Sequence, residues 1–132
     1  MFEVAVAQYG HEMLKGDRHW ALLVVHEPAS DTAYAYQLTG STTTYELKPR
    51  ELVVVTRASS YLGRVRVGTL HPSQLPSFEL VARTVPVHRG SREWHCQHWV
   101  ADALLALNNA GITVQPFLRQ QLAERLSTIS PA

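Results

Sequence analysis

The sequence has 132 residues, of which 45% are hydrophobic and 17% charged, and its formal net charge is +1. This length and composition predict one globular domain, 1–132, and the near-neutral charge argues against a nucleic-acid-binding or membrane-surface protein. The single cysteine excludes an internal disulfide. No signal-peptide pattern and no apolar window of about 18 residues is present, so we expect a soluble, cytoplasmic chain without a transmembrane segment.

Apolar runs of strand length dominate the first half of the sequence. Six strands are predicted, at residues 2–8, 18–25, 31–38, 42–47, 51–56 and 62–70. A polar connection covers residues 9–17, and residues 26–30 form a turn. Helical patterns follow in the second half, beginning near Pro72, at Cys96 and at Phe117. Strands first and helices afterwards predict an α+β domain with an antiparallel sheet packed against helices.

The predicted helix that begins at Cys96 has one apolar stripe at helical spacing, formed by Trp99, Val100, Ala103, Leu104 and Leu107. Gly111 ends this helix, and Ser91 is a possible N-cap, although no Glu or Gln completes a capping box three residues later. Cys96 therefore lies in or near the first turn, where the helix dipole favours a thiolate. A lone cysteine on an apolar helix face is commonly an inert core residue, so a catalytic interpretation needs a partner.

The predicted hairpin of residues 18–25 and 31–38 offers such a partner in His19. A five-residue turn places His19 opposite Gln37. The same register gives one face of mostly small residues (His19, Ala21, Leu23, Ala33, Ala35, Gln37) and one bulky face (Trp20, Leu22, Val24, Tyr34, Tyr36, Leu38). We expect the cysteine helix to approach the face of small residues, which would bring the thiol to the imidazole. The alternative is that His19 only hydrogen-bonds within the sheet and Gln37 is solvated.

Two motifs resemble a known family. Arg18-His19-Trp20-Ala21-Leu22 resembles the histidine strand of the lecithin:retinol acyltransferase-like proteins, a permuted branch of the NlpC/P60 papain-like superfamily. His95-Cys96-Gln97-His98-Trp99-Val100 resembles their cysteine motif, and the order, histidine first, matches that branch. The resemblance implies a permuted papain-like fold with Cys96 as nucleophile and His19 as general base.

The same resemblance assigns the third, ring-orienting position to Gln37. Many acyltransferases of the family have a second histidine there, and the glutamine carbonyl would accept the Nδ1 hydrogen of the imidazole. His95 stands where the motif usually has Asn. The chain also ends in Ser130-Pro131-Ala132, without the apolar anchor of membrane-acting relatives, which makes lipid substrates less expected.

The predicted function is a cysteine-dependent hydrolase or acyltransferase that acts on an ester or amide through a thioester, without cofactor or metal. Its substrate would be a small-molecule, lipid or peptide acyl compound. The alternatives are a catalytically inactive papain-like binding module and a cysteine peptidase or amidase. A metal site at His95, Cys96 and His98 is disfavoured because ligands this close in a helix cannot all point one way. Nucleic-acid binding would use Arg50, Arg57, Arg64 and Arg66. It is disfavoured because Arg64-Val65-Arg66-Val67 alternates as in a strand with one solvent-exposed face.

Overall fold

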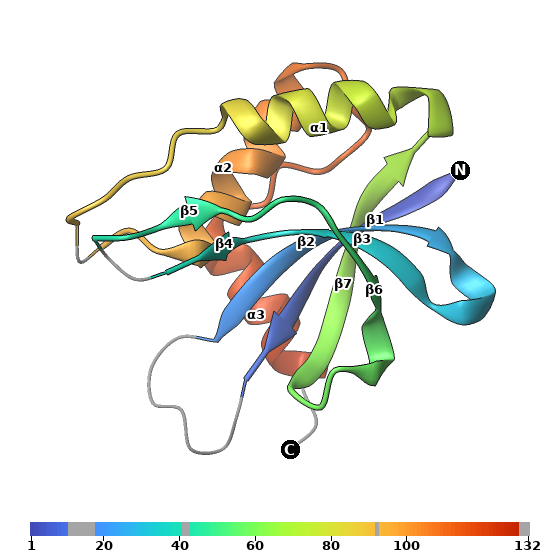
Figure 1. Ribbon diagram of the computed structural model, residues 1–132, viewed down its shortest axis with the longest axis horizontal. Helices are drawn as coiled ribbons and strands as arrows, with labels where there is room; N and C mark the ends of the chain where they lie inside the picture. The colour runs from blue at the N-terminus through green and yellow to red at the C-terminus, as the bar shows by residue number, and fades with distance from the viewer. Residues whose placement is uncertain (11–17, 41–42, 92, 130–132) are drawn as a thin grey trace.

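The computed structural model describes residues 1–10, 18–40, 43–91 and 93–129. Its strands are β1 (Phe2–Tyr9), β2 (His19–Glu27), β3 (Thr32–Tyr36), β4 (Leu38–Thr39), β5 (Glu46–Leu47), β6 (Glu51–Val54) and β7 (Tyr61–Leu70). Its helices are α1 (Leu75–Thr84), α2 (Cys96–Asn109) and α3 (Arg119–Ile129), with 3₁₀ turns at Pro28–Ser30, Val55–Arg57 and Pro72–Gln74. The predicted α+β class with an antiparallel sheet is confirmed (Figure 1).

Five strands form one sheet in the order β6-β3-β2-β1-β7, and every neighbouring pair is antiparallel. β4 and β5 form a separate two-stranded sheet. The predicted strand at 31–38 is therefore divided, because the chain leaves the large sheet at Gln37, whose carbonyl accepts a hydrogen bond from Lys48 N. The predicted strand at 42–47 shortens to β5, and part of the predicted connection at 9–17 lies outside the described residues.

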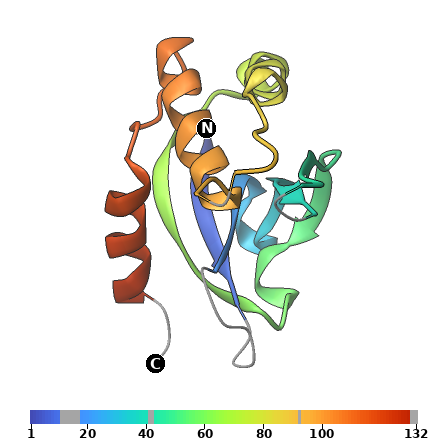
Figure 2. The same ribbon diagram turned by 90° about the vertical axis from the view of Figure 1, so that its left-hand side faces the viewer.

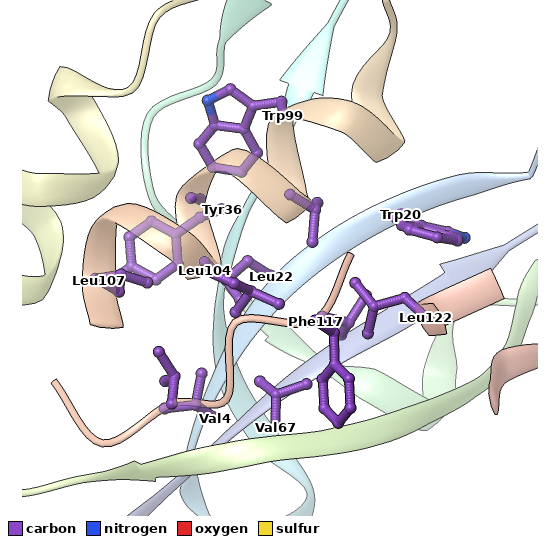
Figure 3. Close-up of a cluster of buried hydrophobic side chains, with 14 of the residues drawn as sticks. Val4, Trp20, Leu22, Tyr36, Val67, Trp99, Leu104, Leu107, Phe117 and Leu122 are labelled. Atoms are coloured by element: carbon purple, nitrogen blue, oxygen red, sulfur yellow. The ribbon is translucent and has the colours of Figure 1, made fainter. Parts of the chain in front are cut away.

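The main core lies between the large sheet and the helices. Trp20, Leu22 and Val24 of β2 alternate toward this side and are buried. They belong to the same buried cluster as the predicted stripe of α2, including Trp99 and Leu104. Figure 3 shows Leu22 of the sheet and Leu104 of the helix in this cluster. Burying a large apolar side chain contributes about 1.5–3 kcal/mol, so these contacts fix the position of α2 on the sheet.

The packing of α2 contradicts one sequence prediction. α2 lies against the bulky face of β2, and the face of small residues forms a second buried cluster (Ala7, Ala21, Leu23, Val25, Ala33, Ala35, Val55). The physical reason is the curvature of the sheet. Its edge strands β6 and β7 are joined by residues 55–60 alone, and the sheet curls toward this side, away from α2 and α3 (Figure 2). Small side chains fit the inside of that curl, which we call the concave face.

The register of the β2–β3 hairpin also differs from the prediction. Leu23 pairs with Ala35 and Val25 with Ala33, which is two residues away from the predicted pairing. The cause is a tighter turn: β2 continues to Glu27, and Asp31 has a left-handed backbone with φ of 53°. A shift of two residues keeps every side chain on its predicted face, whereas a shift of one would have reversed both faces.

Candidate functional site

Cys96 is the first residue of α2, at the helix start predicted from the sequence. The cap, however, is His95 and not Ser91. His95 Nδ1 accepts a hydrogen bond from Gln97 N at 3.3 Å, and His98 Nδ1 accepts one from His95 N at 3.1 Å. Ser91 Oγ instead accepts a bond from Glu93 N. In this capping box, His95 takes the place of the usual Ser or Thr, and His98 takes the place of the usual Glu or Gln. A search for the usual residue types therefore does not find this cap.

The thiol of Cys96 is half-buried and belongs to no disulfide. The residue packs against the main core, as do Tyr45, Leu47 and Trp94. Burial, followed by the neighbouring Cys96, raises the pKa of Tyr45, and the Tyr45 ring meets the Trp94 ring edge-on at 5.9 Å between centroids. Cys96, at the start of α2, is therefore close enough to Tyr45 to influence its ionisation.

His19 and Gln37 are brought together, as predicted. His19 Nε2 and Gln37 Oε1 lie 2.5 Å apart, although the two residues are diagonal neighbours and not direct cross-strand partners. The Gln37 amide nitrogen donates to Glu51 Oε1 at 3.0 Å, so the carbonyl oxygen is the atom that faces the imidazole. Nε2 of His19 is then the donor, and Nδ1 is the basic nitrogen. This corrects the expectation that Gln37 accepts the Nδ1 hydrogen.

Glu51 is a member of this cluster that the sequence did not predict. Its carboxylate accepts bonds from Gln37 and from Lys48, whose amine is 2.8 Å away. The hydrogen bond from Lys48 lowers the pKa of Glu51, burial raises it, and the bond from Gln37 lowers it further. The cluster is therefore a chain from the imidazole through an amide to a carboxylate. The signal that could have found Glu51 is the pairing of β6 with β3, where Glu51 lies opposite Ala35.

The start of α2 is attached to the start of β2 by Gln97. This side chain is only 4% exposed, and its amide nitrogen donates to the Arg18 carbonyl at 2.8 Å. Arg119, the first residue of α3, donates to Gln97 Oε1 at 3.0 Å. The residues next to Cys96 and next to His19 are therefore in direct contact, and both candidate residues lie at the same end of the sheet.

The side chains of Cys96 and His19 nevertheless pack in different places. Cys96 adjoins the main core, whereas His19 lines a pocket whose lining does not include Cys96. Within the described part of the chain, no hydrogen bond joins the two. Proximity of the backbones is therefore shown, and contact between sulfur and imidazole stays a prediction.

The pocket beside His19 has a volume of about 400 Å³ and opens on the concave face. Its lining is formed by Tyr9, Gly10, His19, Ala35, Gln37, Val53, Val54, Val55, Ala58 and Ser60. The volume lies within the range of about 300–1,000 Å³ that is usual for small-molecule sites.

The sequence also raised a metal site and nucleic-acid binding through arginines as disfavoured alternatives. The described residues include no group of three or more His, Cys, Asp or Glu side chains that could hold a metal ion. Among the arginines, Arg50 pairs with Glu79 and lies over the Tyr34 ring, and Arg64 pairs with both Glu3 and Asp31. These two side chains take part in structural ion pairs.

Comparison with known proteins identifies one family. A model of DUF6540, described as a family of unknown function, matches residues 4–114, a segment that contains His19, Gln37 and Cys96. No curated protein and no solved structure matches the chain. Among the described helices, none has the length and apolar character needed to cross a membrane. The match covers most of the sequence, and the chain therefore belongs to the DUF6540 family.

Proposed function

We propose that the chain is a cysteine-dependent hydrolase or acyltransferase with a permuted papain-like arrangement of the kind found in lecithin:retinol acyltransferase-like and NlpC/P60 proteins. Cys96 is the nucleophile, His19 the general base and Gln37 the ring-orienting residue. The observation that carries the proposal is the bond from Gln97 to the Arg18 carbonyl, because it holds the first turn of the cysteine helix beside the first residue of the histidine strand.

The chemistry begins with transfer of the Cys96 proton to His19 Nδ1, directly or through one water. The thiolate attacks the carbonyl carbon of an ester or amide and gives a tetrahedral intermediate, whose oxyanion is favoured by the positive N-terminal end of the α2 dipole. His19 then protonates the leaving group, which departs as an alcohol or amine and leaves a thioester on Cys96. Water or a second acyl acceptor resolves that thioester.

The Gln37–Glu51 pair supports His19 in this reaction. Gln37 holds Nε2 as the protonated nitrogen, which leaves Nδ1 to act as the base. The Glu51 carboxylate lies behind the amide and favours the imidazolium that forms during proton transfer. Gln37 carries no charge itself. The negative charge comes from Glu51, which is the next side chain after Gln37 in the hydrogen-bonded chain that begins at His19.

Alkylation of the only cysteine in the sequence tests the proposal. Iodoacetamide should react with wild-type Cys96 well below pH 8.5, and His19→Ala should move the reaction to about pH 8.5, the ordinary range of a thiol. His71→Asn is the matched control, since His71 is exposed and caps the turn before α1. Wild-type alkylation that begins only near pH 8.5 would instead identify the chain as a catalytically inactive binding module.

A covalent intermediate provides the second measurement. Incubation with p-nitrophenyl acetate should place an acetyl group on Cys96, visible by mass spectrometry of the intact protein, with release of nitrophenolate. Cys96→Ala should abolish both signals. An acetyl group that appears equally in the Cys96→Ala variant would refute a thioester at this residue.

A further inference from the structure

The pocket on the concave face is lined by His19 and Gln37 but not by Cys96. We propose that it binds an uncharged, largely apolar small molecule that carries one hydrogen-bonding group at the His19 end. The site shares His19 and Gln37 with the reaction proposed above, but binding there does not require the thiol, because Cys96 is not among the residues that line it.

The apolar part of the site is made by the sheet itself. Ala35 of β3 and Val53 of β6 point to the concave face, because their cross-strand partners Leu23 and Ala33 belong to the cluster on that face. Val55, which is 1% exposed, closes the wall from the 3₁₀ turn. Alanine at position 35 leaves unfilled the volume that a larger residue would occupy, so the curl of the sheet encloses space next to methyl and isopropyl groups. An apolar ligand body would gain stability by leaving water here.

The polar part of the site lies at one end. His19 and Gln37 lie together at the start of β2, and Tyr9 is the direct cross-strand partner of His19. Ser60 reaches the same end, because its carbonyl accepts a hydrogen bond from Gly10 N at 2.9 Å. Hydroxyl, amide and imidazole groups are therefore gathered on one side of an otherwise apolar pocket, the pattern that orients a ligand in small-molecule sites.

The charge of the ligand follows from the lining. None of the described residues that line the pocket is an Asp, Glu, Lys or Arg. Burial, followed by the influence of Tyr61, raises the pKa of Tyr9 to about 12, so its phenol stays neutral at physiological pH. The Glu51 carboxylate is behind Gln37 and already accepts bonds from Gln37 and Lys48. A charged ligand would lose its hydration against described lining residues that offer no carboxylate, ammonium or guanidinium group, which favours an uncharged ligand.

Fluorescence of prodan, an uncharged naphthyl ketone that brightens in apolar surroundings, tests the site. Wild-type protein should bind prodan saturably. Its affinity for anilinonaphthalene sulfonate, an anionic naphthalene probe, should be at least tenfold lower. Ala58→Trp should abolish the prodan signal, since Ala58 is an exposed residue at the rim and its replacement fills the pocket without disturbing the core. Ala29→Trp is the matched control, exposed and at the far end of the β2–β3 hairpin.

Two further variants complete the test. Tyr9→Phe should weaken prodan binding about fivefold, the effect of one lost hydrogen bond. Cys96→Ala should leave prodan binding unchanged, so failure of the thiol proposal and failure of this one give different results. Equal binding of both probes, or prodan binding that survives Ala58→Trp with an unchanged unfolding midpoint, would overturn the proposal.

Discussion

At the scale of single residues, the candidate site is a set of side chains that hold one another. Gln37 joins the imidazole of His19 to the carboxylate of Glu51, and Lys48 completes the chain. The sequence predicted that His19 and Gln37 would meet, since strand alternation places both on one face. It could not predict which ring nitrogen Gln37 would face, because that choice depends on Glu51, which arrives from β6.

The ionisation of Glu51 makes a pH-dependent contribution to stability. Its pKa in the folded protein is below the ordinary value of 4.5, chiefly through the hydrogen bond from Lys48. A lowered pKa means that stability is present above pH 4.5 and is lost as the pH falls through the folded value. Urea unfolding of wild type and Glu51→Gln should therefore differ most near pH 7 and converge toward pH 3. A constant difference across that range would contradict this assignment.

The histidine cap of α2 makes a second prediction. His95→Ala removes the acceptor of the Gln97 N–H and should lower the free energy of unfolding by about 1 kcal/mol, measured by urea denaturation. His95→Asn retains a short side-chain acceptor, so its free energy of unfolding should fall by only about a few tenths of a kcal/mol. If the two variants are equally destabilised, the effect comes from ring packing against His98 and not from the cap.

At the scale of elements, the connection after α2 depends on close contact with β7. Residues 113–115 run beside the edge strand, with Thr69 N bonded to Thr113 O and Gln115 N bonded to Val67 O. A Cβ atom at Gly68 would lie 2.1 Å from the Thr113 carbonyl oxygen and 2.7 Å from Val114 Cα. Both are backbone atoms, so they cannot move aside without breaking this pairing.

Gly68→Ala should therefore destabilise the protein by about 1–3 kcal/mol or more through overpacking, measured by urea unfolding. Gly90→Ala is the control, because a Cβ there meets nothing within 4 Å and only the positive φ of 83° opposes it. That change should cost about 1 kcal/mol. If Gly68→Ala is no less stable than Gly90→Ala, residues 113–115 can move away from β7 without a loss of stability, which would contradict this prediction.

The sequence predicted the elements better than their arrangement. The stripe of α2 and the two faces of β2 follow from periodicity, and both are present. The face that receives the helix was predicted wrongly, because small residues such as Ala21 and Ala35 suit the inside of a curled sheet as well as a helix contact. The curl follows from the short connection between β6 and β7, two edge strands whose positions local sequence does not specify.

At the scale of the whole molecule, Gln97 joins three parts of the chain that are distant in sequence. Its amide bonds to the residue before β2 and to the first residue of α3, while its own backbone belongs to α2. Because the amide is buried, neither of its bonds is readily replaced by water. The relative placement of strand and helices at the candidate site thus depends on one side chain.

Gln97→Leu should lower the free energy of unfolding by about 1–3 kcal/mol, the cost of leaving buried hydrogen-bonding groups without partners. It should also remove the low-pH alkylation of Cys96, since α2 loses its attachment beside His19. Gln120→Leu makes the same chemical change at an exposed position of α3 and should alter neither measurement. If Gln97→Leu lowers stability but leaves the alkylation profile unchanged, the attachment does not position the thiol.

The segment at residues 113–115 has a consequence beyond stability. A bare outer strand offers unpaired backbone groups to other chains and is a common starting point of aggregation. In this molecule, residues 113–115 occupy the backbone groups of Val67 and Thr69 on the outer strand β7. Displacing that cover would turn β7 into a template for strand addition from a second copy. Self-association, detected by light scattering before any loss of helical signal, would then be the first sign of damage at this edge.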